Sequence, residues 1–221
     1  MKILFACDLD NTLIHSYKKK SAGDICVEIF NGNEQSFMSV ESIELLKKIA
    51  EKVLFVPVTT RSIEQYLRVA ENKNFPAPEF AVVSNGAFLL RDGKIFEHWS
   101  DKKFSVEIQK QFEKFSTHTE FTNCKIVDES FLFLKCAEDV DIEKIQTETS
   151  LKVQRTGQKI YLFPPNLNKG EALKNLIKKF SPDKIFCAGD SEIDLPMLNL
   201  ADVAYYQKNF AEEFLKDIFC T

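Results

Sequence analysis

The sequence is poor in the features that mark several large classes of protein. None of its apolar runs approaches the roughly 20 residues of a membrane span. The start, MKILFACDLD, has too short an apolar stretch for a secretory signal. The 33 Asp and Glu residues outnumber the 29 Lys and Arg residues, for a net charge of −4, unlike the basic footprint of a nucleic-acid-binding protein. We therefore expect neither a membrane nor a nucleic acid as a partner.

Cysteine pairs with metal-binding spacing are also missing. None of the six cysteines forms a CxxC pair, and none of the three histidines lies near them in the sequence, which argues against a zinc site. This scattered pattern favours reduced cysteines and a cytoplasmic location. The sequence carries no signal for an oligomeric state.

Apolar residues, in contrast, are plentiful. They make up 44% of the 221 residues and include 20 Phe, enough for a sizeable core. This length suits one large domain or a core with a smaller insert.

Both ends of the chain alternate between apolar strand patterns and amphipathic helix patterns. Continuous apolar runs of this kind are typical of parallel strands covered on both faces. The expected strands span 2–8, 53–60, 79–87 and 184–190, and the expected helices span 41–52, 63–72 and a segment that begins at 169. Asn31-Gly32 predicts a hairpin within the first part. The alternation predicts an α/β fold with a three-layer, Rossmann-like parallel sheet.

The middle of the chain has a different pattern. Residues 88–163 contain strand-like pieces joined by hairpin turns, with helical segments at about 102–117 and 139–149. This is an α+β pattern. We therefore predict a core formed by residues 1–87 and 164–221, with residues 88–163 inserted as a smaller α+β domain.

Reactive side chains gather where the expected parallel strands end. Ligands of open parallel sheets bind beyond the carboxyl ends of the strands. The candidates there are Asp8, Asp10, Thr59, Thr60, Arg61, Ser84, Asn85, Asp190 and Asp194, with Lys169 at the start of a helix. Carboxylates that crowd together repel one another unless a cation lies between them. Mg²⁺ commonly binds carboxylates together with phosphate oxygens, so Asp8 and Asp190 could hold Mg²⁺. Thr59 and Lys169 could then hold the rest of a phosphoryl group.

Five segments together carry a family resemblance. DLDNTL, VTTRS, SNGA, NKGEAL and GDSEIDLPML resemble the ordered motifs of the haloacid dehalogenase superfamily. They most resemble its branch of Cof-type sugar phosphatases and sucrose-phosphatase-like enzymes. The resemblance covers the predicted core. Residues 88–163 are similar to the cap domain of that branch only in position and in strand–helix pattern.

The resemblance implies a role for each matching residue. Asp8 matches the nucleophile that becomes an aspartyl-phosphate, and Asp10 matches the general acid and base. The backbone carbonyl of Asp10 also matches a metal ligand. Thr59 matches a hydrogen-bond donor to phosphate, and Lys169 matches the cation beside the transferring group.

The remaining matches concern metal and substrate. Asp190 matches a Mg²⁺ ligand, and Asp194 an acid that binds metal or orients Lys169. Asn85 matches a polar residue that faces the phosphate. Thr60 stands where Gly is usual, and Ile193 where Asn is usual, so the phosphate and metal contacts are expected to differ there. Arg61 is a candidate for substrate contact and equally for a helix-start residue paired with an acid.

These features predict a Mg²⁺-dependent phosphatase that acts on a small phosphorylated metabolite such as a sugar phosphate. A phosphomutase of the phosphomannomutase type is the enzymatic alternative, but residues 88–163 contain only Arg91 and Arg155 to hold a bisphosphate. A non-catalytic phosphate-binding interaction protein is the third hypothesis. The presence of Asp8, Asp10 and Asp190 argues against it.

Overall fold

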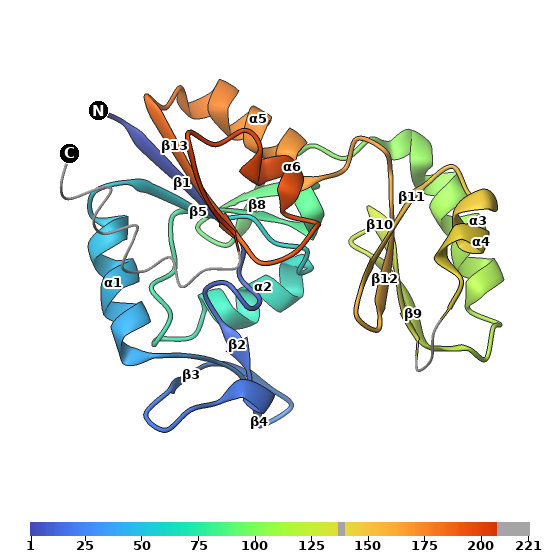
Figure 1. Ribbon diagram of the computed structural model, residues 1–221, viewed down its shortest axis with the longest axis horizontal. Coiled ribbons are helices and arrows are strands. Elements are labelled where there is room, and N and C mark those ends of the chain that lie inside the picture. Colours follow the sequence, from blue (N-terminus) through green and yellow to red (C-terminus); the bar gives the residue numbers. More distant parts are fainter. Residues whose placement is uncertain (137–139, 207–221) are drawn as a thin grey trace.

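The structure, a computed structural model, describes residues 1–136 and 140–206 of the chain (Figure 1). The sequence pattern also predicts a last helix after the short strand DVAYY, and that helix falls outside the described residues. In Figure 1 a larger part that contains the N-terminus and the strand that ends at Tyr206 lies beside a smaller part built from residues of the middle of the chain. No helix within the described ranges is long and apolar enough to cross a membrane.

A parallel sheet forms the centre of the larger part, as the sequence predicts. The buried run ILFAC forms the inner strand β1, which pairs in parallel with β13 on one side and with β5 on the other. The strands in spatial order are β14 (Val203–Tyr206), β13 (Lys184–Gly189), β1 (Ile3–Cys7) and β5 (Leu54–Pro57).

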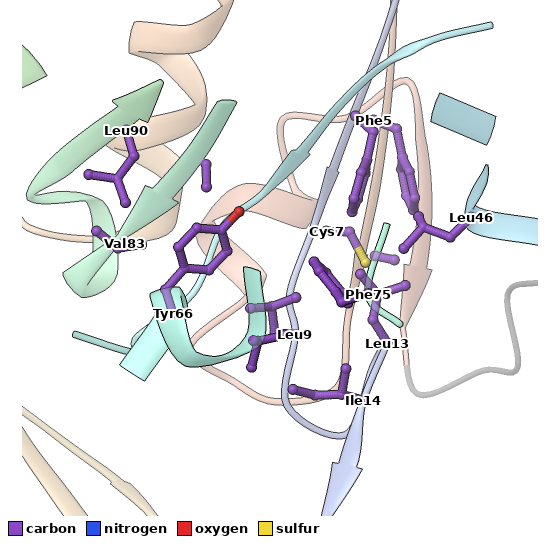
Figure 2. Close-up of a cluster of buried hydrophobic side chains, with 14 of the residues drawn as sticks. Phe5, Cys7, Leu9, Leu13, Ile14, Leu46, Tyr66, Phe75, Val83 and Leu90 are labelled. Carbon is purple, nitrogen blue, oxygen red and sulfur yellow. The ribbon is translucent and has the colours of Figure 1, made fainter. Parts of the chain in front are cut away.

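Helices cover both faces of this sheet, which gives three layers. Side chains of β1 alternate between the faces, so Phe5 and Cys7 contact one hydrophobic cluster and Leu4 and Ala6 contact another. Figure 2 shows the first cluster, where Phe5 and Cys7 lie near Leu46. The helices are α1 (Val40–Ala50) and α2 (Ile63–Ala70) on that face, and α5 (Lys169–Phe180) and α6 (Leu195–Leu198) on the opposite face.

Three further strands extend the sheet beyond β5. A parallel bridge joins Val58 to Val82, next to β5 and in β6 (Phe80–Val83). Strand β7 (Phe88–Arg91) then pairs antiparallel with β6, and β8 (Lys94–His98) pairs antiparallel with β7. The sequence prediction placed residues 88–98 in the insert, whereas this pairing places them with the larger part. A hairpin pattern shows that two strands pair but not which sheet edge they join. The division into two domains stays a prediction, and the pairing favours a boundary after β8.

A small antiparallel sheet follows β1 in the chain. Its strands are β2 (His15–Ser16), β4 (Asn33–Met38) and β3 (Ile25–Phe30). Asn31 and Gly32 connect β3 to β4 with φ angles of 50° and 76°. Positive φ at both turn residues is what a tight hairpin requires, so the predicted hairpin is confirmed. Short 3-10 helices lie at Tyr17–Lys19, Ser84–Gly86 and Lys102–Phe104.

The smaller part is an antiparallel sheet with helices on one face. Its strand order is β11 (Lys152–Thr156), β12 (Lys159–Phe163), β10 (Phe131–Cys136) and β9 (Phe121–Val127), with helices α3 (Ser105–Phe115) and α4 (Ile142–Thr147). In β10, Leu132 and Leu134 pack under the helices, whereas Phe131 and Phe133 face the other way and join the cluster of the larger part. Figure 1 shows α3 and α4 on the far side of this sheet from the larger part.

Candidate active site

Two aspartates lie at the carboxyl end of β1 and point toward the same region. The strand continues for one hydrogen bond past Cys7, because the Asp8 N–H donates to the Ala188 carbonyl at 3.0 Å. Leu9, between the aspartates, is completely buried. Asn11 follows with a φ of 62° and turns the chain away from the sheet. Asp8 is only 6% exposed, so its charge is held almost without contact to bulk water.

Lys169 provides a cation inside the site. Asn168 caps α5 through its side chain, which places Lys169 in the first turn. The Lys169 Nζ donates to Asp8 Oδ1 at 2.5 Å and to Asp194 Oδ1 at 2.6 Å. Burial alone would lower the pKa of Lys169, but the two carboxylates outweigh it and the net shift is upward. The lysine therefore stays charged.

Asp194 is held by hydrogen bonds on both of its oxygens. Its Oδ2 accepts from the Asp190 N–H at 3.1 Å, and from the N–H and hydroxyl of Ser191 at 3.0 Å each. Burial would raise the pKa of Asp194, but Lys169 outweighs burial and the pKa falls below its usual range. With both oxygens occupied, Asp194 fits the role of orienting Lys169 and the β13 loop better than that of a direct metal ligand.

Three carboxylates lie together in the site, and two of them, Asp8 and Asp190, could bind a hard cation directly, whereas hydrogen bonds occupy both oxygens of Asp194. Asp8, Asp190 and Asp194 each place one carboxylate oxygen within 4.8 Å of the others. Burial is the largest influence on Asp8 and raises its pKa to about 7, although Lys169 pulls the pKa downward. Burial also raises the pKa of Asp190. A divalent cation favours the charged form of such groups, and all-oxygen ligands suit Mg²⁺, so the residues fit that ion.

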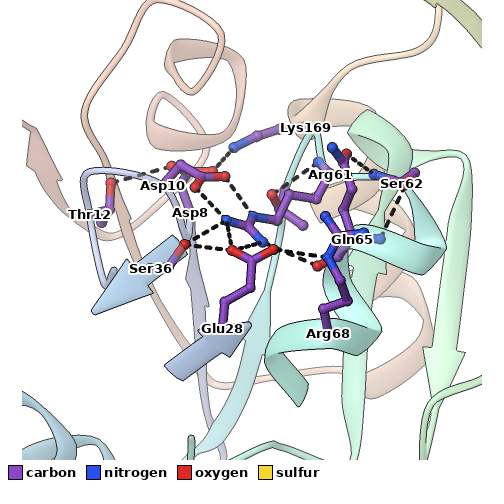
Figure 3. Close-up of polar contacts among 11 residues, drawn as sticks. Asp8, Asp10, Thr12, Glu28, Ser36, Arg61, Ser62, Gln65, Arg68 and Lys169 are labelled. Carbon is purple, nitrogen blue, oxygen red and sulfur yellow. Dashed lines mark hydrogen bonds and ion pairs between the residues drawn. The ribbon is translucent and has the colours of Figure 1, made fainter. Parts of the chain in front are cut away.

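The Asp10 side chain pairs with an arginine, whereas the group that the sequence analysis assigned to the metal is the backbone carbonyl of Asp10. Its carboxylate accepts two hydrogen bonds from Arg61, Nε to Oδ2 and Nη2 to Oδ1, each 2.8 Å long (Figure 3). Burial would raise the pKa of Asp10, but the Arg61 guanidinium outweighs burial and holds that pKa below its usual range. The sequence analysis considered Arg61 either as a substrate contact or as a helix-start residue paired with an acid. The structure shows the pairing with an acid, and the substrate contact stays a prediction.

Arg61 is itself held by a buried glutamate that the sequence analysis missed. Glu28 is 3% exposed and lies 3.0 Å from the Arg61 guanidinium. It also accepts from Arg68 at 3.2 Å and from Ser36 at 2.5 Å. Figure 3 shows Glu28 between the two arginines. The available signal was a charged residue inside the apolar strand CVEIF, and the network joins β3 and α2 to Asp10.

Thr59 and Asn85 lie deeper than the sequence analysis expected. Thr59 is completely buried, and its hydroxyl accepts from the Arg61 N–H at 3.2 Å. Asn85 is also completely buried, and its amide donates to the Leu167 carbonyl at 3.2 Å. Neither is among the described residues that line the cavity at the aspartates. Thr60, which stands in place of the usual Gly, does line it.

A cavity of about 70 Å³ joins these groups to the smaller part of the molecule. Its lining residues are Asp8, Asp10, Asn11, Thr60, Thr156, Lys159, Tyr161, Lys169, Asp190, Ser191 and Ile193. Thr156, Lys159 and Tyr161 come from the β11–β12 hairpin and were not predicted as site residues. Burial raises the pKa of Tyr161 to about 12, so its phenol stays neutral. The hairpin was visible in the sequence, but not its position over the aspartates.

Family models match along most of the chain. A model described as haloacid dehalogenase-like hydrolase matches residues 98–218, and one described as sucrose-6F-phosphate phosphohydrolase matches residues 1–127. Each match covers more than half of the 221 residues. A comparison with curated proteins found no match.

Solved structures of low sequence identity share the fold. The sucrose-phosphatase from Synechocystis sp. PCC6803, in complex with sucrose and phosphate, is 13% identical with a TM-score of 0.64, covering 100% of this chain and 98% of that one. A phosphatase of the haloalkanoate (HAD) superfamily from Bacteroides thetaiotaomicron is 16% identical with a TM-score of 0.67, covering 100% and 96%. A trehalose-6-phosphate phosphatase related protein is 17% identical with a TM-score of 0.60, covering 98% and 96%.

Proposed function

We propose that this chain, which belongs to the haloacid dehalogenase-like hydrolases and is a phosphatase, hydrolyses a small phosphorylated metabolite through an aspartyl-phosphate on Asp8 with Mg²⁺ as cofactor. The observation that carries the proposal is the position of Asp8: a buried carboxylate 2.5 Å from the Lys169 Nζ, grouped with Asp190 and Asp194. A carboxylate nucleophile needs nearby positive charge when it meets an anionic phosphate.

The first step transfers the phosphoryl group to Asp8. An Asp8 oxygen attacks phosphorus, the bond from phosphorus to the ester oxygen breaks, and Asp10 gives a proton to that oxygen as the alcohol leaves. Lys169 lies against the Asp8 carboxylate and offsets negative charge on the transferring group. General acid help of this kind is typically worth about 10²–10⁴-fold in rate.

The second step returns the enzyme to its starting state. A water attacks the phosphorus of the aspartyl-phosphate, Asp10 accepts its proton, and the bond to Asp8 breaks to release inorganic phosphate. The ion pair with Arg61 favours the ionised form of Asp10, which is the form this step requires. The first step needs the protonated form, so we expect the pair to loosen when substrate binds.

Asp8, Asp190 and the backbone carbonyl of Asp10 are the groups we propose as protein ligands of Mg²⁺. Asp194 holds the loop of Asp190 and the amine of Lys169. When bound, the ion would offset the charge of the carboxylates and of the phosphate.

The substrate class follows from the family rather than from the cavity. The sucrose-6F-phosphate phosphohydrolase match and the fold shared with sucrose and trehalose-6-phosphate phosphatases support a sugar phosphate as substrate. We propose that the β9–β12 sheet acts as a cap, because Thr156, Lys159 and Tyr161 close the cavity over the aspartates. Arg91 and Arg155, the two arginines weighed for a phosphomutase, do not line that cavity.

Release of inorganic phosphate from a panel of phosphorylated metabolites tests the proposal. We expect turnover with Mg²⁺, none in excess EDTA, and recovery when Mg²⁺ is added back. Asp190→Asn should lower both Mg²⁺ affinity and turnover, because an anionic ligand becomes neutral. Glu192→Gln, two residues further along the loop, is the matched control and should retain activity. Full activity in EDTA would overturn the metal-dependent mechanism.

A further inference from the structure

The face of the β9–β12 sheet that looks toward the aspartates carries lysines. In β12, Ile160 and Leu162 pack under the helices, so Lys159, Tyr161 and Phe163 lie on the opposite face. Tyr161 and Lys159 both line the cavity that contains Asp8 and Asp10. The β12 register therefore points Lys159 toward the site.

Every charged residue in these four strands is a lysine or an arginine. Strand pairing shows which of them share the Tyr161 face, because directly paired residues of an antiparallel sheet point the same way. Lys125 pairs with Phe133, Lys135 with Lys159, and Lys152 with Phe163. This face of the sheet is thus cationic.

Lys135 and Lys159 form a directly opposed pair of like charges. Such pairs have Cβ atoms roughly 4.5–5.5 Å apart and destabilise a sheet unless an anion compensates. Among residues 1–136 and 140–206, no carboxylate oxygen lies within 4.0 Å of either ammonium group. Within the described residues, no ion pair therefore neutralises either ammonium group directly, although the charge of Lys159 acts at longer range on Asp10 and helps to lower the pKa of Asp10.

The transferring phosphoryl group already has a lysine. Lys169 contacts Asp8 and Asp194 directly, whereas Lys159 contacts neither of them within ion-pair distance and lines the same cavity from the β11–β12 hairpin. Lys135 lies beside Lys159 but does not line the cavity. The two lysines therefore form a cationic rim that faces the part of a substrate outside the reacting phosphate.

We propose that Lys159 and Lys135 bind a second anionic group on the leaving part of the substrate, a carboxylate or a second phosphate. The inference rests on the proposed phosphatase function and narrows its substrate class to phosphomonoesters with a second negative charge. A neutral sugar would leave the lysine pair uncompensated.

A matched substrate pair tests this. 3-Phosphoglycerate carries a carboxylate where glycerol 3-phosphate carries a hydroxymethyl group, and glycerol 1,3-bisphosphate carries a second phosphate. We expect kcat/KM to be about tenfold higher for 3-phosphoglycerate or for glycerol 1,3-bisphosphate than for glycerol 3-phosphate. A factor of this size is the effect of one charge-assisted hydrogen bond. The preferred ester identifies which anion is bound. The ratio should shrink as ionic strength rises, because salt screens exposed charges.

Lys159→Gln should bring that ratio close to one, because kcat/KM should fall more for the esters with a second anionic group than for glycerol 3-phosphate. Lys159→Arg should retain the preference, since the charge remains. The control is Lys110→Gln, which removes the same charge from an exposed position on α3, on the helix side of the sheet. It should leave the ratio of the kcat/KM values unchanged. An equal loss for all esters in Lys159→Gln would mean that Lys159 serves the transferring phosphate, and it would overturn the inference.

Binding measurements separate this inference from the proposed reaction. The Asp8→Asn protein lacks the nucleophile but keeps both lysines, so calorimetric titration with Mg²⁺ and each ester reports recognition without turnover. Tighter binding of an ester with a second anionic group than of glycerol 3-phosphate would support the proposed role of the lysines even if no ester were hydrolysed. This difference in affinity should be lost in the Asp8→Asn/Lys159→Gln double variant. Equal kcat/KM and equal affinity for the three esters in protein with intact lysines would overturn it.

Discussion

Arg61 binds the carboxylate of Asp10 through two parallel hydrogen bonds of 2.8 Å each, and Glu28 lies 3.0 Å from the same guanidinium. Asp10 comes from the end of β1, Arg61 from the end of β5, and Glu28 from β3 of the hairpin sheet. The candidate acid and base is therefore oriented by an arginine that a buried glutamate holds in place. A planar guanidinium suits this because it can bind two carboxylates in fixed geometry.

Replacing Arg61 should move the pH profile toward higher pH. Arg61→Met removes the largest influence that offsets burial of Asp10, while the charges of Lys159 and Lys169 remain, so the pKa of Asp10 should rise. Because the first step needs protonated Asp10, the fall of kcat/KM on the basic side should occur at higher pH than in wild type. The measurement is kcat/KM against pH with an alkyl phosphate, whose leaving oxygen needs the proton.

The same variant should also lose stability. Removing one partner of a buried ion pair typically costs about 3–5 kcal/mol, and the Arg61–Glu28 pair is buried on both sides. The Asp10 side chain is 43% exposed, so loss of its pair with Arg61 adds less. Arg68→Met is the matched control, since Arg68 contacts Glu28 and Glu64 but not Asp10. Arg68→Met should lower the free energy of unfolding in urea less than Arg61→Met does, and it should leave the pH dependence of kcat/KM unchanged. A basic limb that stays fixed in Arg61→Met would show that Arg61 does not set the pKa of Asp10.

Mg²⁺ binding should release protons in a pH-dependent amount. The pKa of Asp8 is about 7 without metal, and a metal ligand has to be ionised. Below that pKa Asp8 is mostly protonated and gives up its proton when the ion binds; above it there is little to release. Calorimetry in buffers of different ionisation enthalpy should therefore show more proton release at pH 6 than at pH 8. Asp8→Asn should remove most of this difference, and equal release at both pH values in wild type would contradict the prediction.

Gly189→Ala should disturb the site through Asp194. A Cβ on Gly189 would lie 2.5 Å from the Asp194 Cβ and 2.6 Å from its Cγ, far inside normal contact. Asp194 would have to shift, and with it the hydrogen bonds to Lys169 and Ser191. Overpacking of this kind typically costs about 1–3 kcal/mol, measured as the free energy of unfolding in urea. Mg²⁺ affinity should fall as well.

Gly170→Ala is the comparison for that variant. Its Cβ would meet the Pro196 carbonyl oxygen at 2.6 Å, which pushes α6 away from α5 without touching the Asp194 side chain. Stability should fall here too, but Mg²⁺ affinity should fall less than in Gly189→Ala. If both variants lost Mg²⁺ affinity equally, the effect of Gly189→Ala would be one of general destabilisation.

Asp128 should control how the cap lies on the core. It sits in the turn between β9 and β10, and its Oδ2 accepts from the Ile63 N–H at 2.9 Å and from the Ser84 hydroxyl. Asp128→Ala removes both bonds, each worth about 1 kcal/mol. We expect a larger radius of gyration in small-angle X-ray scattering and a higher KM, because the β11–β12 hairpin would close the cavity less often. Glu129→Ala, in the same turn, is the control, and an unchanged radius and KM in Asp128→Ala would argue against this role.

Sequence alone predicted which residues would lie together at the centre of the candidate site. The apolar runs of β1 and β13 predict buried parallel strands, and parallel strands end at the same edge of a sheet. Asp8 and Asp190 therefore had to lie close together, and Lys169 at the start of α5 could reach them. The hairpin at Asn31-Gly32 was predictable for a similar local reason, since the turn needs two residues with positive φ.

The tertiary structure decided the contacts that depend on packing between distant segments. A hairpin pattern does not specify its sheet edge, so only the pairing with β6 assigned β7 and β8. Nothing near Glu28 in the sequence indicates Arg61, because their meeting depends on how β3 packs against α2. The opposition of Lys135 and Lys159 likewise depends on strand register, in which a slip of one residue turns every side chain to the other face. Local pattern determined the strands and the residues at their ends, whereas long-range packing determined which of those residues share a partner.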